Sequence, residues 1–325
     1  MACFGAFSAF QARAQAPGVR PPVCEPIIVG SLDGYAGFRY PSWNMARLNP
    51  LDNQQLVAVR SEAEGPAVHR NLYWLDLRTH QQKLLLRDVG CGLSWGRSGW
   101  VVLERGGRLW KLKANGDSLT QLPVAPDTYH PAWNPSGQLL ACVQADSLNP
   151  EQSGIVLLRP SGKVAKHLAI GNIWVTSNLA WSPNGRKLAF FGIAGGYAGG
   201  PEYVYEFDLP SGQTRLLFKP VSYLQHGYNS LHWLPNGKEL LWRAANSGLT
   251  TLHLASGRQR LIWQQMYLLS VDVDAKHSRL LVVRADSQLD RRGPGVGKLY
   301  STGNLLTSAV NGSKQVPINR PATGR

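Results

Sequence analysis

The sequence predicts an all-β protein, a six-bladed β-propeller with four antiparallel strands in each blade. Three observations lead to this prediction. A motif of the form Trp-x-Pro-(Asn/Ser)-Gly occurs three times between apolar segments, and its tryptophan belongs to a series of anchors that return about every 40–50 residues. The segments between copies alternate apolar and polar residues. A helical solenoid of similar period would need a 3.6-residue repeat, so the pattern favours propeller blades.

The best copy of the motif is residues 178–191, which read NLAWSPNGRKLAFF. Proline suits the first corner of a type I turn, and asparagine suits the second. The glycine that follows, Gly185, supplies the positive φ with which a right-twisted hairpin closes. Residues 182–185 are therefore predicted to form a hairpin turn between two apolar strands.

One large apolar residue marks the inner strand of each blade. The successive anchors are Trp43, Trp95, Trp133, Trp181 and Trp233, with Val273 in the sixth position. Their spacings are 52, 38, 48, 52 and 40 residues. Because a tryptophan recurs in almost every blade, we interpret these residues as structural anchors that pack between neighbouring sheets.

The motif resembles the WD40-like repeat of the TolB-type six-bladed propeller, and it is best matched at residues 132–143, 180–191 and 232–242. The resemblance implies a propeller that spans residues 41–320. It does not imply one activity, because the same repeat occurs in a periplasmic translocation protein, in peptidase propellers and in many other exported proteins. TolB has an additional N-terminal α/β domain, and we expect this chain to lack it.

The N-terminal residues indicate export. Residues 1–16 combine a short apolar core with two small-x-small cleavage candidates, which is typical of a signal peptide, although a disordered tail is the alternative. Residues 17–40 are predicted to be a linker, in which residues 27–29 form a strand that closes the ring. We expect a periplasmic or secreted protein of the bacterial envelope with no transmembrane span, because no apolar run approaches about 20 residues.

The composition constrains the partners. The chain has 325 residues, a formal net charge of +14 and four cysteines without CxxC spacing. The cysteines predict no zinc site, and we expect no metal and no cofactor. The charge indicates an anionic partner, such as an acidic glycan or a membrane surface, or simply a solvated basic surface.

The two faces of the predicted propeller differ. The turns between first and second strands, and between third and fourth strands, share one face, which we call the turn face. Longer loops at residues 61–70, 145–153, 192–202 and 285–297 lie on the other face, where a partner is expected to bind. The predicted basic residues of the turn face are Arg97, Arg186, Lys187, Lys238, Arg258 and Lys276.

Four residues are candidates for a ligand site at the mouth of the central channel, because they precede the inner strands of the third and fifth blades. They are Tyr129, His130, His226 and Tyr228. If such histidines bound a metal, the protein would be a propeller lyase acting on acidic oligosaccharides. A structural role for each histidine is the competing interpretation.

No catalytic residues are predicted. The sequence contains no Gly-x-Ser-x-Gly elbow and we expect no α/β-hydrolase domain, so the pattern does not favour the peptidases that carry such propellers. It also has no nucleic-acid motif, and an exported protein would not meet nucleic acid. The predicted function is a non-catalytic exported scaffold, expected to be monomeric, that binds a protein or an anionic envelope polymer. The metal-dependent lyase is the alternative.

Overall fold

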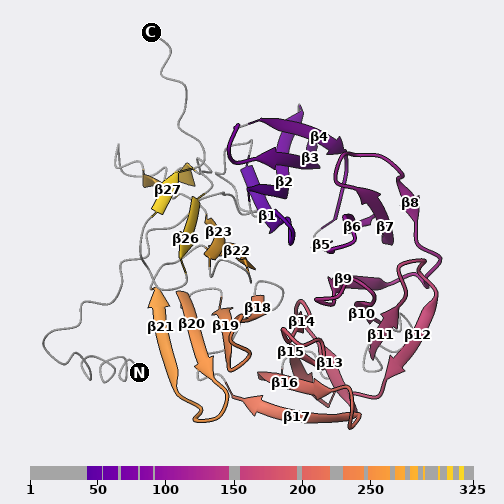
Figure 1. The fold of residues 1–325 in the computed structure, drawn as a ribbon, viewed down its shortest axis with the longest axis vertical. Helices are drawn as coiled ribbons and strands as arrows, with labels where there is room; N and C mark the ends of the chain where they lie inside the picture. Colours follow the sequence, from indigo (N-terminus) through magenta and orange to yellow (C-terminus); the bar gives the residue numbers. More distant parts are fainter. Residues whose placement is uncertain are drawn as a thin grey trace, which may run out of the picture.

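The computed structural model describes residues 42–317, apart from internal segments. The segments outside the description are 53, 65–66, 80, 91, 146–153, 196–199, 220–229, 245–247, 264–267, 275–278, 285–287, 290–298, 301–305 and 310–314. Every regular element within the described residues is a β-strand (Figure 1). A search of the same residues finds no helix with the length and apolar character needed to cross a membrane.

Six sheets follow one another in chain order around a ring, and we number them as blades 1 to 6 (Figure 1). Five of them have four strands, and the remaining sheet, blade 4, has five. The first strand of each blade faces the centre of the ring, and the last lies at its rim. The prediction of an all-β propeller with four-stranded antiparallel blades is confirmed.

The strands have the following bounds. Blade 1 contains β1 (Ser42–Leu48), β2 (Gln55–Glu64), β3 (Ala67–Asp76) and β4 (Gln82–Leu86). Blade 2 contains β5 (Leu93–Trp95), β6 (Trp100–Arg105), β7 (Arg108–Lys113) and β8 (Thr120–Gln121). Blade 3 contains β9 (Thr128–Trp133), β10 (Leu140–Gln144), β11 (Gly154–Leu158) and β12 (Val164–Leu168).

The second half of the ring has the same plan. Blade 4 contains β13 (Ile173–Val175), β14 (Ala180–Trp181), β15 (Lys187–Ala194), β16 (Glu202–Asp208) and β17 (Gln213–Phe218). Blade 5 contains β18 (Ser230–Trp233), β19 (Glu239–Ala244), β20 (Gly248–His253) and β21 (Gln259–Trp263). Blade 6 contains β22 (Leu268–Asp274), β23 (Arg279–Arg284), β26 (Leu306–Ala309) and β27 (Gln315–Pro317). A separate pair is formed by β24 (Gln288–Leu289) and β25 (Leu299–Tyr300).

The extra strand of blade 4 arises from a break in its inner strand. β13 and β14 both pair with β15, at opposite ends of that strand. Between them, the hydroxyl of Ser177 accepts the backbone N–H of Phe191 at 3.0 Å. The backbone N–H of Thr176 donates to the carbonyl of Phe191 at 3.0 Å. The break therefore stays bonded to β15.

The hairpin turn predicted at residues 182–185 forms between β14 and β15. The N–H of Gly185 donates to the carbonyl of Ser182 at 2.8 Å, which closes the turn. Gly185 has a φ of +68°, a conformation that glycine adopts without steric strain. The side chain of Asn184 accepts the N–H of Arg186 at 3.1 Å. Local sequence chemistry therefore explains this turn.

The core lies between blades. Trp95, Trp133, Trp181 and Trp233 are only 7–8% exposed, and each belongs to an apolar cluster with residues of the preceding blade. Truncation of a buried side chain of this size to alanine costs about 3–5 kcal/mol. The tryptophans therefore hold adjacent blades together. The side chain of Trp43 lies outside the described residues.

Blades 6 and 1 are adjacent in space, so that the last blade meets the first. β22 packs against β1, and the described strands of blade 6 come from the C-terminal part of the chain. Val273, the predicted sixth anchor, lies on β22. Residues 27–29, the predicted closing strand, lie outside the described residues.

Candidate functional site

A cavity of about 520 Å³ occupies the centre of the ring. It is lined by the inner strand of every blade and by the turns that follow five of these strands. Turn residues in the lining are Asn49, Pro50, Gly96, Arg97, Asn134, Pro135, Pro183 and Pro235. Because these are the turns between first and second strands, the cavity extends to the turn face.

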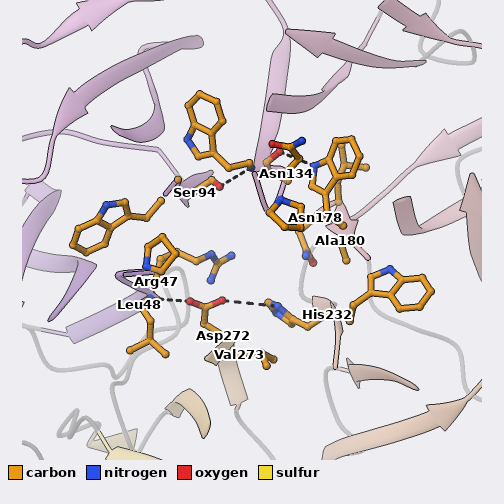
Figure 2. Close-up of a pocket in the computed structure, with 18 of the residues that line it drawn as sticks. Arg47, Leu48, Ser94, Asn134, Asn178, Ala180, His232, Asp272 and Val273 are labelled. Atoms are coloured by element: carbon orange, nitrogen blue, oxygen red, sulfur yellow. Dashed lines mark hydrogen bonds and ion pairs between the residues drawn. The ribbon is translucent and has the colours of Figure 1, made fainter. Parts of the chain in front are cut away.

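Arg47 and Asp272 connect three blades at one side of the cavity (Figure 2). The Nε of Arg47 donates to the carbonyl of Leu93 in blade 2 at 3.2 Å. Its Nη1 donates to Ser270 Oγ in blade 6 at 3.1 Å. Asp272 Oδ2 accepts the backbone N–H of Leu48 at 2.8 Å. These bonds join blade 1 to both of its neighbours.

Similar contacts join the next two blade pairs. The hydroxyl of Ser94 in blade 2 accepts the backbone N–H of Trp133 in blade 3 at 3.0 Å. The indole N–H of Trp181 in blade 4 donates to the carbonyl of Ala132 at 2.9 Å. Each contact links an inner strand to the inner strand that follows it around the ring.

Asn178 connects blades 4 and 5 on the opposite side of the cavity. Its amide donates to the carbonyl of Leu231 at 2.8 Å and accepts the N–H of the same residue at 3.1 Å. Blades 4 and 5 are thus joined by a two-bond amide bridge. Between blades 5 and 6, His232 Nδ1 lies 4.0 Å from Asp272 Oδ1. Hydrogen bonds therefore join five of the six successive blade pairs around the cavity, and blades 5 and 6 approach each other at His232 and Asp272.

The cavity holds a positive guanidinium beside a neutral imidazole. Burial, and then the charge of Arg47, lowers the pKa of His232 to about 3, so the ring is neutral near pH 7. Burial also lowers the pKa of Arg47, and the nearby carboxylate of Asp272 partly opposes this shift. His232 Nε2 is buried and has no hydrogen-bond partner.

Most of the hydrogen bonds made by these polar groups connect neighbouring blades. The side chains of Arg47, Asn178 and Asp272 bond to the backbone of a neighbouring blade. In the described parts of the chain, no group of three or more His, Cys, Asp and Glu residues is placed to hold a metal ion. The side chains of Arg47, Asn178 and Asp272 therefore fix the walls of the cavity.

Two of the four predicted channel-mouth residues can be placed. Tyr129 and His130 lie on β9, and their rings make an edge contact with centroids 4.8 Å apart. The cavity lining begins at the next residue, Pro131, so neither of them lines the cavity. Burial lowers the pKa of His130 to about 4. His226 and Tyr228 lie outside the described residues.

The partly buried carboxylate of Glu104 contacts β9 beside these two residues. Glu104 Oε1 accepts the backbone N–H of His130 at 2.9 Å, which joins blades 2 and 3. Burial raises the pKa of Glu104, and the N–H groups of His130 and Gly92 partly oppose this shift. A side chain at Gly92 would overlap this carboxylate, with only 1.9 Å between its Cβ and Glu104 Oε1.

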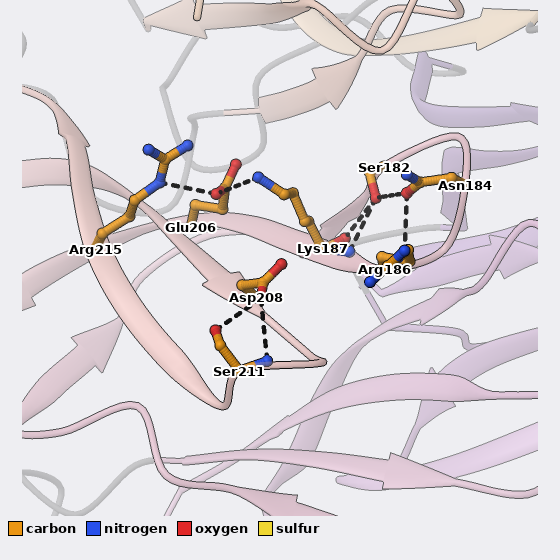
Figure 3. A network of polar contacts seen from close by, with 8 residues as sticks. All are labelled: Ser182, Asn184, Arg186, Lys187, Glu206, Asp208, Ser211 and Arg215. Carbon is orange, nitrogen blue, oxygen red and sulfur yellow. Dashed lines mark hydrogen bonds and ion pairs between the residues drawn. The ribbon is translucent and has the colours of Figure 1, made fainter.

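The predicted basic residues of blade 4 differ in their surroundings (Figure 3). Lys187 Nζ donates to Glu206 Oε1 at 2.8 Å, and Arg215 Nε donates to the same oxygen at 2.9 Å. The Glu206 side chain is 1% exposed. Lys187 is therefore neutralised by a buried acid that the sequence analysis did not place beside it. Arg186 is exposed.

The other basic residues lie on turns. Arg97 is exposed and lines the mouth of the cavity. Lys238 and Arg258 are exposed on the turns that follow β18 and β20. Lys276 lies outside the described residues.

The sequence analysis did not identify Arg47, Ser94, Asn178 and Asp272 as residues of the cavity. A signal for two of them is present in the repeat. The residue before the anchor is polar in blades 1, 2, 5 and 6, where it is Ser42, Ser94, His232 and Asp272. Arg47 and Asn178 lie at other positions, so the repeat gives no equivalent signal for them.

No protein-family model matches the sequence, and no curated protein matches it either. Solved structures do match. A putative TolB from Agrobacterium tumefaciens has a TM-score of 0.57 at 16% identity, over 77% of this chain and 88% of that one. A hydrazine synthase chain from Kuenenia stuttgartiensis has a TM-score of 0.54 at 12% identity, over 91% of this chain and 100% of that one.

A chain of a mitotic checkpoint complex is also similar, with a TM-score of 0.52 at 14% identity over 95% of this chain and 86% of that one. These structures are of differently named proteins at 12–16% identity, so the matches establish the fold alone. They confirm that the chain is a TolB-like β-propeller in its architecture.

Proposed function

We propose that this protein is a non-catalytic exported scaffold that binds a protein or an anionic envelope polymer at its turn face. The observation that carries the proposal is the central cavity, which is lined by all six blades and reaches the turns. The ends of propeller channels are concave sites with fixed walls, which is what a binding site requires. The proposed contact surface is the turn face, whereas the sequence predicted binding on the opposite face, which has the longer loops.

The charge of the turn face supports the same proposal. Arg97 is exposed at the cavity mouth, and Arg186, Lys238 and Arg258 are exposed on other turns of that face. Positive charge spread over one face attracts an anionic partner at long range without specifying it. The fixed cavity then supplies the shape that discriminates between partners.

A blocked cavity mouth tests the proposal. Pro183 is exposed and lines the cavity, so Pro183→Trp should reduce the binding of the purified protein to the envelope fraction of its source cells. Ser136 is exposed on another turn of the same face and does not line the cavity, so Ser136→Trp is the matched control. Equal binding of the two variants would overturn the proposal.

Export and the lyase alternative are tested on protein from the native cells. Mass spectrometry of the mature N-terminus should find a cleavage within residues 12–16 if residues 1–16 are a signal peptide. A stoichiometric divalent metal in the same sample, lost in His130→Ala, would instead favour the lyase that acts on acidic oligosaccharides. We expect the exported protein to be monomeric.

A further inference from the structure

A cluster of basic residues lies on the turn face where blades 2 and 3 meet. Two lysines of β7 lie over the ring of Trp100 on β6. Lys113 Nζ is 4.1 Å from the centroid of this ring, and Lys111 Nζ is 4.7 Å from it. Both distances are within the range of a cation–π interaction.

Backbone carbonyls hold the same two ammonium groups. Lys111 Nζ donates to the carbonyl of Pro160, in the turn between the third and fourth strands of blade 3, at 2.8 Å. Lys113 Nζ donates to the carbonyl of Ser98 at 3.4 Å. Neutral groups therefore position both charges, and neither interaction cancels them.

Three further cations extend this pair into a track. Arg97 precedes Ser98, and Arg159 and Lys163 flank Pro160 in a turn closed by a 2.8 Å bond from the N–H of Arg159 to the carbonyl of Lys163. All three are exposed. The track consists of Arg97, Lys113, Lys111, Arg159 and Lys163, and it crosses the boundary between the two blades.

The track is not neutralised by the protein. None of its five cations forms an ion pair with a carboxylate in the described part of the chain. An acidic residue, Asp117, lies on an adjoining turn. Its backbone carbonyl accepts the N–H of Lys113. The carboxylate of Asp117 accepts the amide of Asn115 at 2.6 Å. The track therefore carries excess positive charge.

We infer that this track, with Trp100 at its centre, is a binding site for an acidic polysaccharide. A linear polymer with repeated carboxylates can contact successive cations, and the two ammonium groups held over one indole ring offer it adjacent contacts. Trp100 is a positioning residue, because its ring fixes the two ammonium groups without an acid. The inference takes only the exported location from the proposed function, since the track is separate from the cavity walls apart from Arg97.

The test uses the purified full chain and fluorescently labelled polygalacturonate as the probe, with dextran as the neutral polymer and duplex DNA as a phosphate polymer. K111Q/K113Q removes two charges and keeps hydrogen-bond donors for the two carbonyls. R186Q/K238Q removes two exposed charges from other turns of the same face and is the matched control. Anisotropy titrations at roughly 50 and 200 mM salt give the affinity and its salt dependence.

We expect K111Q/K113Q to weaken polygalacturonate binding about tenfold, and to reduce the slope of log K against log salt by about two. The control should lose less than about twofold. W100L should weaken polygalacturonate binding roughly threefold. W100F keeps an aromatic ring under the two ammonium groups and should weaken binding much less. Thermal unfolding checks the fold, and if K111Q/K113Q unfolds, T120E replaces it, because Thr120 lies opposite Lys111 in the β7–β8 ladder.

Three results would overturn the inference. One is an equal loss of polygalacturonate affinity in K111Q/K113Q and R186Q/K238Q, which would mean that the positive charge of the whole face, and not the track, attracts the polymer. Another is binding of duplex DNA that is as tight as that of polygalacturonate. The third is no binding of polygalacturonate by the unmodified protein. Pro183→Trp should leave polygalacturonate binding unchanged, so the failure of this site and the failure of the cavity proposal are distinguishable.

Discussion

Blades 2 and 4 both carry lysines near the turn face, yet their charges have different surroundings. In blade 4, Lys187 and Arg215 share the buried carboxylate of Glu206 (Figure 3). In blade 2, Lys111 and Lys113 contact an indole ring and backbone carbonyls. The comparison teaches that a basic sequence motif does not define a basic surface. The partner of each cation decides whether its charge is available.

Removal of both cations in blade 4 should have the largest effect. Lys187→Met with Arg215→Met leaves the 1% exposed Glu206 side chain without its counter-charges, which should cost about 3–5 kcal/mol of unfolding free energy. The matched pair, Lys111→Met with Lys113→Met, leaves no buried charge and should cost about 1 kcal/mol or less. Urea unfolding measures both variants. Equal losses would contradict the contrast.

Neutralisation of Glu206 should leave the basic residues of blade 4 without a carboxylate partner, as the lysines of blade 2 already are. Glu206→Gln keeps the shape of the side chain and leaves Lys187 and Arg215 without a carboxylate. We expect a loss of about 1–2 kcal/mol in urea unfolding, because a charge-assisted hydrogen bond is replaced by a neutral one. Polygalacturonate should bind roughly twofold more tightly. If Glu206→Gln bound the polymer more weakly, the amount of unpaired positive charge would not explain the affinity.

An added acid should convert blade 2 toward the character of blade 4. Thr120 is exposed and lies directly opposite Lys111, so Thr120→Glu places a carboxylate beside that ammonium group. The cross-strand pair should stabilise the protein by about 0.2–1 kcal/mol and weaken polygalacturonate binding roughly threefold. Thr120→Gln is the uncharged control. If it weakened binding as much as Thr120→Glu, the contact surface rather than the charge would be responsible.

The smallest effect is expected at the exposed end of the blade 4 site. Hydrogen bonds from the hydroxyl and N–H of Ser211, with the charges of Lys187 and Arg186, lower the pKa of Asp208. The stability from this carboxylate is present above its unfolded pKa and is lost as pH falls through the lower folded pKa. Ser211→Ala should raise the pKa of Asp208, as NMR titration can measure. An unchanged titration would exclude the hydroxyl as its cause.

The repeated unit is predictable from the amino-acid sequence alone. Turn residues act within a few positions of the chain, so Ser182 and Gly185 close their hairpin as the local pattern predicts. The alternation of apolar residues predicted the strands, and the repeat predicted that tryptophans such as Trp181 would be buried. These features are readable because propensity and periodicity are local properties.

The contacts between polar side chains, in contrast, depend on how the blades pack around the ring. Leu48 and Asp272 are 224 positions apart in sequence, and they bond because the ring brings the last blade to the first. The repeat likewise does not reveal that Glu206 neutralises Lys187, or that Lys111 reaches the carbonyl of Pro160 in the next blade. The reason is physical. Strand patterns fix the fold of each blade, whereas the pairing of charges depends on side-chain reach across strands and between blades.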